Sequence, residues 1–158
     1  MSASTRLTNL PLPRVAFLPG RTARPARFEC TLDEAALAPE RWRENTAWLF
    51  GVDLYNHGFA WEAHEVWEPL WLRASDPRHK LFVQALIQCA ASALKRALGE
   101  PSSSKRLAER ACLKFAALES ELPAGYMGLA HAAFAADFRT FGASSDADFE
   151  ARPRLRIE

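Results

Sequence analysis

One short stretch of the sequence concentrates side chains that could bind a metal ion or move a proton. Glu62, His64, Glu65 and Glu68 fall within two turns of a predicted helix. His64 and Glu68 lie four residues apart and so share a face, where a neutral imidazole and a carboxylate can bind one divalent metal ion together. Glu65 offers a third ligand and pairs with Glu62 on a neighbouring, more polar flank. The types and spacing make His64, Glu65 and Glu68 the candidate metal ligands.

Aromatic and amide side chains near these residues are expected to line a pocket. Three tryptophans share the predicted motif helix, and Asn56 precedes it. The next predicted helix is apolar nearly all round, apart from one narrow polar stripe that includes Gln84 and Gln88. If the stripe faces His64 and Glu68, these polar side chains meet in the interface between the two helices. If the stripe faces water, no such polar contact forms. The expected pocket-lining residues are Asn56, Trp61, Glu62, Trp67, Trp71, Gln84 and Gln88.

Three functions agree with this residue set, and the sequence leaves all three open. The first is a module that binds a small ligand or a divalent metal. The second is a non-catalytic structural or interaction module whose His-Glu-Gln network only fixes helix packing, because buried polar groups must be paired whatever their function. The third is a metal-assisted hydrolase. Since the sequence lacks a His-Glu-x-x-His motif, a Gly-x-Ser-x-Gly elbow and a glycine-rich phosphate loop, we favour the binding module over an enzyme.

The motif helix and its neighbours also resemble a known family. The residues that carry the resemblance are Asn56-x-Gly58, then Glu62-Ala63-His64-Glu65-x-x-Glu68-x-x-Trp71, and then Gln84-Ala85-Leu86-Ile87-Gln88. This pattern is similar to that of the prokaryotic family catalogued as domain of unknown function 309, over roughly residues 40 to 120. The resemblance implies a small all-helical domain, and it implies no established activity.

The whole sequence is typical of one globular, all-α domain. A chain of 158 residues, 49% apolar and 25% charged, is long enough to bury a single core. Helical periodicity and capping signals predict a compact bundle of about five helices over residues 40–142. Five prolines and five arginines predict an extended N-terminal arm over residues 1–39, and residues 143–158 are predicted to form a flexible tail. The expected helices are about 40–55, 59–74, 78–98, 102–122 and 127–141, and Gly142 is expected to end the last one.

Charge and cysteine usage limit the expected partners. The net charge is +1, but residues 1–30 carry five arginines against one glutamate, about +4, which leaves about −3 for the remainder. An acidic bundle does not favour nucleic acid, and we expect the arm to contact an anionic partner, such as the acidic remainder of the chain or a neighbouring subunit. The three cysteines lack a metal-binding spacing, and no apolar run reaches about 18 residues. We therefore expect a reduced, cytoplasmic protein without a membrane segment, with a homo-oligomer, a small-molecule ligand and a divalent metal cofactor left open.

Overall fold

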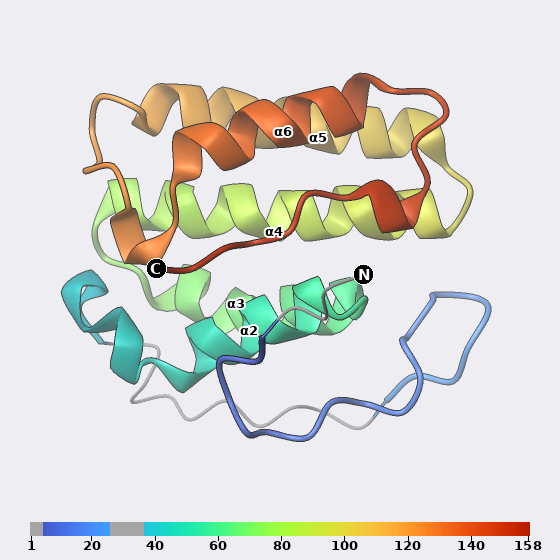
Figure 1. The fold of residues 1–158 in the computed structure, drawn as a ribbon, viewed down its shortest axis with the longest axis horizontal. Coiled ribbons are helices and arrows are strands. Elements are labelled where there is room, and N and C mark those ends of the chain that lie inside the picture. The colour runs from blue at the N-terminus through green and yellow to red at the C-terminus, as the bar shows by residue number, and fades with distance from the viewer. Residues whose placement is uncertain (1–4, 26–36) are drawn as a thin grey trace.

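The computed structural model describes residues 5–25 and 37–158, and its regular structure is helical (Figure 1). The five α-helices of the described residues are α2 (Thr46–Asn56), α3 (Ala60–Arg73), α4 (Pro77–Ala97), α5 (Pro101–Leu118) and α6 (His131–Ala143). Three short 3-10 helices accompany them, namely η1 (Pro39–Glu44), η2 (Tyr126–Gly128) and η3 (Phe149–Ala151). The predicted all-α bundle is therefore confirmed.

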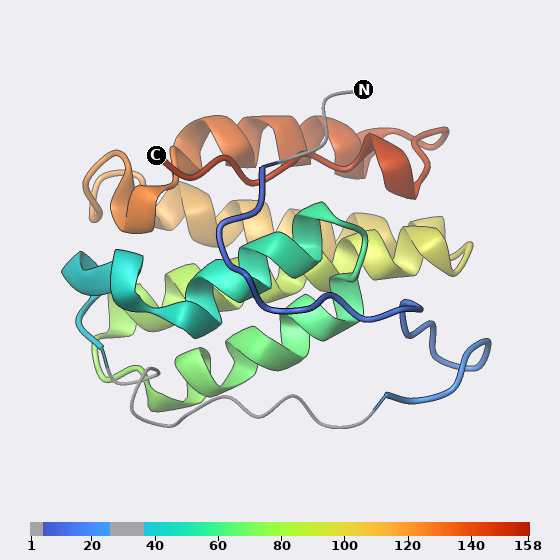
Figure 2. The ribbon, with the colours of Figure 1, turned by 60° about the horizontal axis from the view of Figure 1, so that its bottom comes forward.

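Each α-helix packs against the next one along the chain, and α4 lies in the middle of the bundle. Figure 1 and Figure 2 both show α4 between α5 and the α2–α3 pair, with α6 beside α5. Phe82, Val83 and Leu86 of α4 are almost completely buried. A helix that contacts neighbours on most of its circumference needs apolar residues nearly all round, as the sequence of this segment predicted.

The helix boundaries near the motif follow local capping signals. The predicted first helix is split, because the Asn45 side chain accepts a hydrogen bond from the Trp48 N–H at 3.0 Å and starts α2 separately from η1. Asp76 caps α4 in the same way, because its carboxylate accepts a hydrogen bond from the Arg78 backbone N–H at 2.8 Å. Gly58 has a φ of +94° in the turn between α2 and α3, a left-handed position that favours glycine.

The last helix differs from its prediction at both ends. It starts at His131 rather than near Met127, because Met127 has a φ of +54° in a turn that also contains the left-handed Gly125 and Gly128. At the other end, Gly142 lies inside α6 and does not terminate it. A Cβ atom at Gly142 would lie 2.4 Å from the Ala108 Cβ of α5, so this glycine permits a close approach of two helices.

The described part of the N-terminal arm lies along α2 and α3 (Figure 2). Asp53 of α2 accepts hydrogen bonds from Leu7 and Thr8, with each backbone nitrogen 2.8 Å from a carboxylate oxygen. Glu62 of α3 accepts a third backbone hydrogen bond, from Phe17, at 3.0 Å. Because extended backbone has unpaired N–H groups, two carboxylates of the bundle are suitable acceptors for it.

Arginines fix the arm at both ends of this path. The Arg6 Nε lies 3.2 Å from the buried Asp53 carboxylate. Arg21 donates to the carbonyl oxygens of Ala97 and Leu98, at 3.3 and 2.7 Å, at the C-terminal end of α4. Cations are favourable at that end of a helix because the last carbonyl groups carry partial negative charge.

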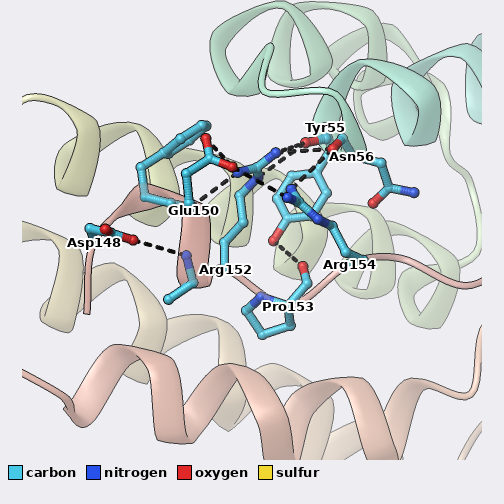
Figure 3. Close-up of polar contacts among 9 residues, drawn as sticks. Tyr55, Asn56, Asp148, Glu150, Arg152, Pro153 and Arg154 are labelled. Carbon is cyan, nitrogen blue, oxygen red and sulfur yellow. Dashed lines mark hydrogen bonds and ion pairs between the residues drawn. The ribbon is translucent and has the colours of Figure 1, made fainter. Parts of the chain in front are cut away.

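Composition predicts a flexible tail over residues 143–158, but Ala143 ends α6 and the residues after it pack against the end of α2 (Figure 3). The Asn56 side-chain amide pairs with the backbone of Leu155 in both directions, at 2.8 Å each. The Tyr55 hydroxyl donates to the Pro153 carbonyl at 2.8 Å. The Arg152 guanidinium donates to the carbonyl oxygens of Tyr55 and Asn56. The arginine-rich composition of the tail did not predict these contacts, because their partners lie 96–99 residues away in the sequence.

Two of the three cysteines are described, and both are buried and free of disulfide bonds. Burial raises the pKa of the Cys89 and Cys112 thiols, so neither is a reactive nucleophile. Cys30 lies outside the described residues. None of the helices in the described part of the chain is long and apolar enough to cross a membrane.

Candidate functional site

The three candidate metal ligands lie together on the outer face of α3. One ligand atom from each of His64, Glu65 and Glu68 can be chosen so that all lie within 4.8 Å of one another. The His64 Nδ1 and Glu65 Oε1 are 3.4 Å apart, and these two side chains are 32% and 31% exposed. The cluster is therefore open to solvent, whereas Val66, Trp67 and Leu70 of the same helix pack into the core.

The separations in this cluster are close to those of a coordination shell. Oxygen and nitrogen ligands bind zinc at about 2.0–2.2 Å, so two ligands of one ion lie at most about 4.4 Å apart and about 3.4 Å apart in a tetrahedron. The His64–Glu65 distance already has the tetrahedral value. Small side-chain rotations would bring all three groups within reach of one ion. Three protein ligands on one helix leave further coordination positions for water or a ligand.

The glutamines of α4 do not join this cluster by hydrogen bonds. Among the described residues, neither His64 nor Glu68 is hydrogen bonded to Gln84 or Gln88. Gln88 instead has a buried Oε1 without a hydrogen-bond partner in the part of the chain that the structure describes. The two glutamines and the His64 cluster are thus not one hydrogen-bonded network.

Glu62 is the buried carboxylate of α3. The sequence pattern placed it on a polar flank, and this assignment is wrong, because the side chain is 0% exposed. Its Oε2 accepts the Phe17 N–H, and its Oε1 has no partner among the described residues. Burial raises the pKa of this carboxyl group above its ordinary value, against a smaller lowering by the Phe17 hydrogen bond. The arm that covers Glu62 lies far away in the sequence, so helix periodicity could not reveal the burial.

The three tryptophans of α3 contact different neighbours. Trp67 is buried in the core, 5.8 Å from the ring centre of Trp48, and its Nε1 donates to the Trp48 carbonyl at 3.3 Å. A Cβ atom at Gly51 would lie 2.0 Å from the same Nε1, so the absence of a side chain there makes room for the indole. Trp61 lies against Phe17 of the arm, with ring centres 4.6 Å apart, and Trp71 lies under the Lys80 ammonium. The rings are therefore parts of separate contacts, and Trp67 belongs to the core.

Asn56 and two further histidines are already engaged in structural contacts. Both polar atoms of the Asn56 amide are used by Leu155, so this residue holds the tail. The His57 Nδ1 lies 2.8 Å from the Asp53 carbonyl oxygen at the end of α2. His131 is 2% exposed, and its Nε2 lies 3.1 Å from the Pro123 carbonyl oxygen. His57 is therefore a helix-end residue, and His131 is a histidine of the core.

One polar pair was missed in the sequence. The His79 Nδ1 lies 2.8 Å from the Tyr126 hydroxyl, beside a cavity of about 560 Å³ between the start of α4 and η2. Burial lowers the pKa of His79 and raises that of Tyr126, so both groups are neutral near pH 7. His79 and Tyr126 are 47 positions apart and belong to no common motif, so no sequence pattern predicts that they meet.

Comparison with known proteins agrees with the motif. The model of a domain of unknown function, DUF309, matches residues 48–107, a segment that contains α3, α4 and most of α2. No curated protein and no solved structure matches the chain. The motif of α3 and the glutamines of α4 both lie in the matched segment, so residues 48–107 of this chain are similar to the DUF309 family.

Proposed function

We propose that this protein is a small helical module that binds a divalent metal ion through His64, Glu65 and Glu68. The observation that carries the proposal is the convergence of one imidazole and two carboxylates, with ligand atoms within 4.8 Å, on one face of α3. The partial exposure of His64 and Glu65 supports it, because an ion and a small-molecule ligand can reach the cluster from solvent.

The donor set indicates which ions to test. Imidazole suits zinc, iron, nickel and copper, whereas carboxylates also suit manganese. Calcium takes six to eight oxygen ligands, and one histidine with two glutamates does not provide them. We therefore propose a transition-metal ion such as Zn²⁺ or Mn²⁺. Water or a small ligand completes its coordination shell.

The structural alternative is supported by other residues. A network that only fixes helix packing should be buried and fully paired. Asp53 fits that description, because it is buried and both of its oxygens accept hydrogen bonds from the arm. Glu62 is also buried and holds the arm, although only its Oε2 is paired among the described residues. We therefore assign the structural role to Asp53 of α2 and Glu62 of α3. The proposed metal-binding role belongs to other carboxylates, those of the His64 cluster on α3.

Titration calorimetry on metal-free protein tests the proposal. We expect Zn²⁺ or Mn²⁺ to bind the wild type at one site and to raise its melting temperature. The substitutions His64→Ala and Glu68→Gln should each weaken binding at least about tenfold, which corresponds to about 1.4 kcal/mol. Glu119→Gln is the matched control, because Glu119 is an exposed carboxylate at the end of α5. Equal affinity in the wild type and both cluster variants, or no binding at all, would contradict the proposal.

A further inference from the structure

An apolar groove of about 410 Å³ runs between α5 and α6. Small side chains line it, among them Ala108, Cys112 and Ala116 of α5 and Gly142 of α6. Leu113 stands at its edge and is 72% exposed, more than any other large hydrophobic residue among those that the structure describes. An exposed leucine next to an apolar groove is a suitable anchor point for a partner.

Cationic side chains border this groove. Lys105 and Arg139 line the groove. On α5, Arg106, Arg110 and Leu113 have the spacing i, i+4 and i+7, so these three exposed residues form a stripe along one side of the helix. Glu109 is the acidic residue among those that line the groove. The four cationic residues and this one carboxylate together give a local net charge of about +3. None of the four cations forms an ion pair within the described ranges 5–25 and 37–158.

The cations of α5 also affect one another. The pKa of Lys114 is lowered by burial and, to a smaller extent, by the charge of Arg110 one turn earlier. The free protein therefore has like charges close together on this helix, and an acidic partner would relieve their repulsion.

The combination of charge and groove distinguishes between kinds of partner. A second copy docked through the same face by two-fold symmetry would place cations against cations. Nucleic acid binds cations through its phosphates, and would leave Leu113 and the groove without an apolar partner. An amphipathic helix with acidic residues on its polar side satisfies both features, because its apolar face fits the groove and its carboxylates meet the rim.

We propose that the groove between α5 and α6, with Leu113 and the cationic stripe, binds an acidic amphipathic helix of another protein. The surface lies on α5 and α6, outside the candidate metal ligands of α3. Binding at the groove is therefore testable independently of metal binding.

Fluorescence anisotropy with two labelled synthetic peptides tests this proposal. The first peptide carries leucines at i, i+3, i+4 and i+7 and glutamates elsewhere, and the second has lysine in place of each glutamate. We expect the acidic peptide to bind and the basic peptide not to bind. The affinity of the acidic peptide should fall as salt is added, because exposed charges are screened.

Single substitutions, each with a matched control, test whether the peptide binds at the groove between α5 and α6. Leu113→Gln and Arg110→Glu should each weaken binding of the acidic peptide at least about tenfold. Leu72→Gln and Arg14→Glu are the controls and should leave it unchanged, because Leu72 is 60% exposed on α3 and Arg14 is exposed on the arm. Circular dichroism confirms that the surface variants keep the helical content of the wild type.

Three results would overturn the proposal. The first is equal or absent binding of the two peptides, and the second is binding of the acidic peptide that neither Leu113→Gln nor Arg110→Glu weakens. The third concerns other partners. If a DNA duplex or vesicles with anionic lipid bind more tightly than the acidic peptide, and Leu113→Gln has no effect, the surface recognises polyanions rather than a helix. Concentration-dependent dimerisation that Arg110→Glu strengthens would assign the face to a second copy.

Discussion

Glu62 has a carboxyl group that is completely enclosed by protein, with one oxygen hydrogen bonded to Phe17 and the other without a partner among the described residues. An ionised carboxylate in such a place is costly, and the group responds by keeping its proton to a higher pH. Its pKa is accordingly raised by burial. Glu62 thus differs from Glu65 and Glu68 of the same helix, which are partly exposed and face solvent.

The raised pKa of Glu62 predicts how stability depends on pH. Above the ordinary carboxyl value of 4.5, the unfolded chain loses the Glu62 proton while the folded chain keeps it. The folded state then binds more protons, so the contribution of Glu62 to stability is fully present below that value and is lost as pH rises through the folded pKa.

We predict that the free energy of unfolding depends less on pH in Glu62→Gln than in the wild type. Near pH 7 the variant should be at least as stable as the wild type. The glutamine amide keeps an acceptor for the Phe17 N–H and cannot ionise. Glu62→Ala should instead cost about 1–3 kcal/mol, because it leaves that N–H unpaired. Urea unfolding at a series of pH values measures both effects. Parallel profiles for the wild type and Glu62→Gln would show that Glu62 does not titrate in this range.

At the scale of elements, the last carbonyl groups of α2 accept hydrogen bonds from the tail (Figure 3). The last carbonyl groups of a helix need donors, and the Arg152 guanidinium supplies them to Tyr55 and Asn56 at 3.0–3.2 Å. The guanidinium is also stacked over the Phe149 ring, 4.1 Å from its centre. Burial lowers the pKa of Arg152 to about 10, so it remains charged near pH 7 and complements the helix dipole.

We predict that Arg152→Ala destabilises the protein by about 1.5–3 kcal/mol, the range for hydrogen bonds to charged groups. Arg152→Lys should recover part of the loss, because one ammonium cannot reproduce the fork that reaches both carbonyl groups. Arg156→Ala is the control in the same tail, since Arg156 is exposed, and should change stability by less than about 0.5 kcal/mol. Chemical denaturation measures all three variants. Equal stability of Arg152→Ala and Arg156→Ala would mean that the tail does not hold α2.

For the whole molecule, both chain ends converge on α2. The arm binds Asp53 in the last turn of that helix, and the tail binds Asn56 at its end. The family segment 48–107 contains these two acceptors but neither of the extensions that occupy them. The bundle is therefore completed by parts of the chain that lie outside the family match.

We predict that deletion of residues 1–25 lowers the free energy of unfolding by at least about 2 kcal/mol. The deletion removes several charge-assisted hydrogen bonds and uncovers Glu62 and Trp61. Asp53→Ala should cost less in the deleted protein than in the full chain, because its partners Leu7 and Thr8 are then already absent. Chemical denaturation gives the double-mutant cycle, and size-exclusion mass shows whether the arm affects self-association. Additive losses would show that Asp53 and the arm are not coupled.

The helices near the motif could be predicted from the sequence because their signals are local. Gly58, Asp76 and Pro77 mark helix ends within a few residues of the positions that they determine, and a regular apolar spacing predicts which side of a helix is buried. The same locality predicted that His64 and Glu68 share a face and that Glu65 lies on the neighbouring flank. Their grouping within 4.8 Å follows from helix geometry alone.

Only the tertiary structure decided which polar groups are buried and what they bind. Glu62 is covered by Phe17, 45 residues earlier, and Asn56 is paired with Leu155, 99 residues later. Gly142 looks like a helix stop in the sequence, yet it lies inside α6, where Ala108 of another helix leaves no room for a side chain. Periodicity describes the faces of one helix, and the solvent exposure of a face depends on segments that reach it from elsewhere in the chain. The local pattern therefore determined the elements and the grouping of His64, Glu65 and Glu68, while long-range packing determined the roles of Glu62, Asn56 and Gly142.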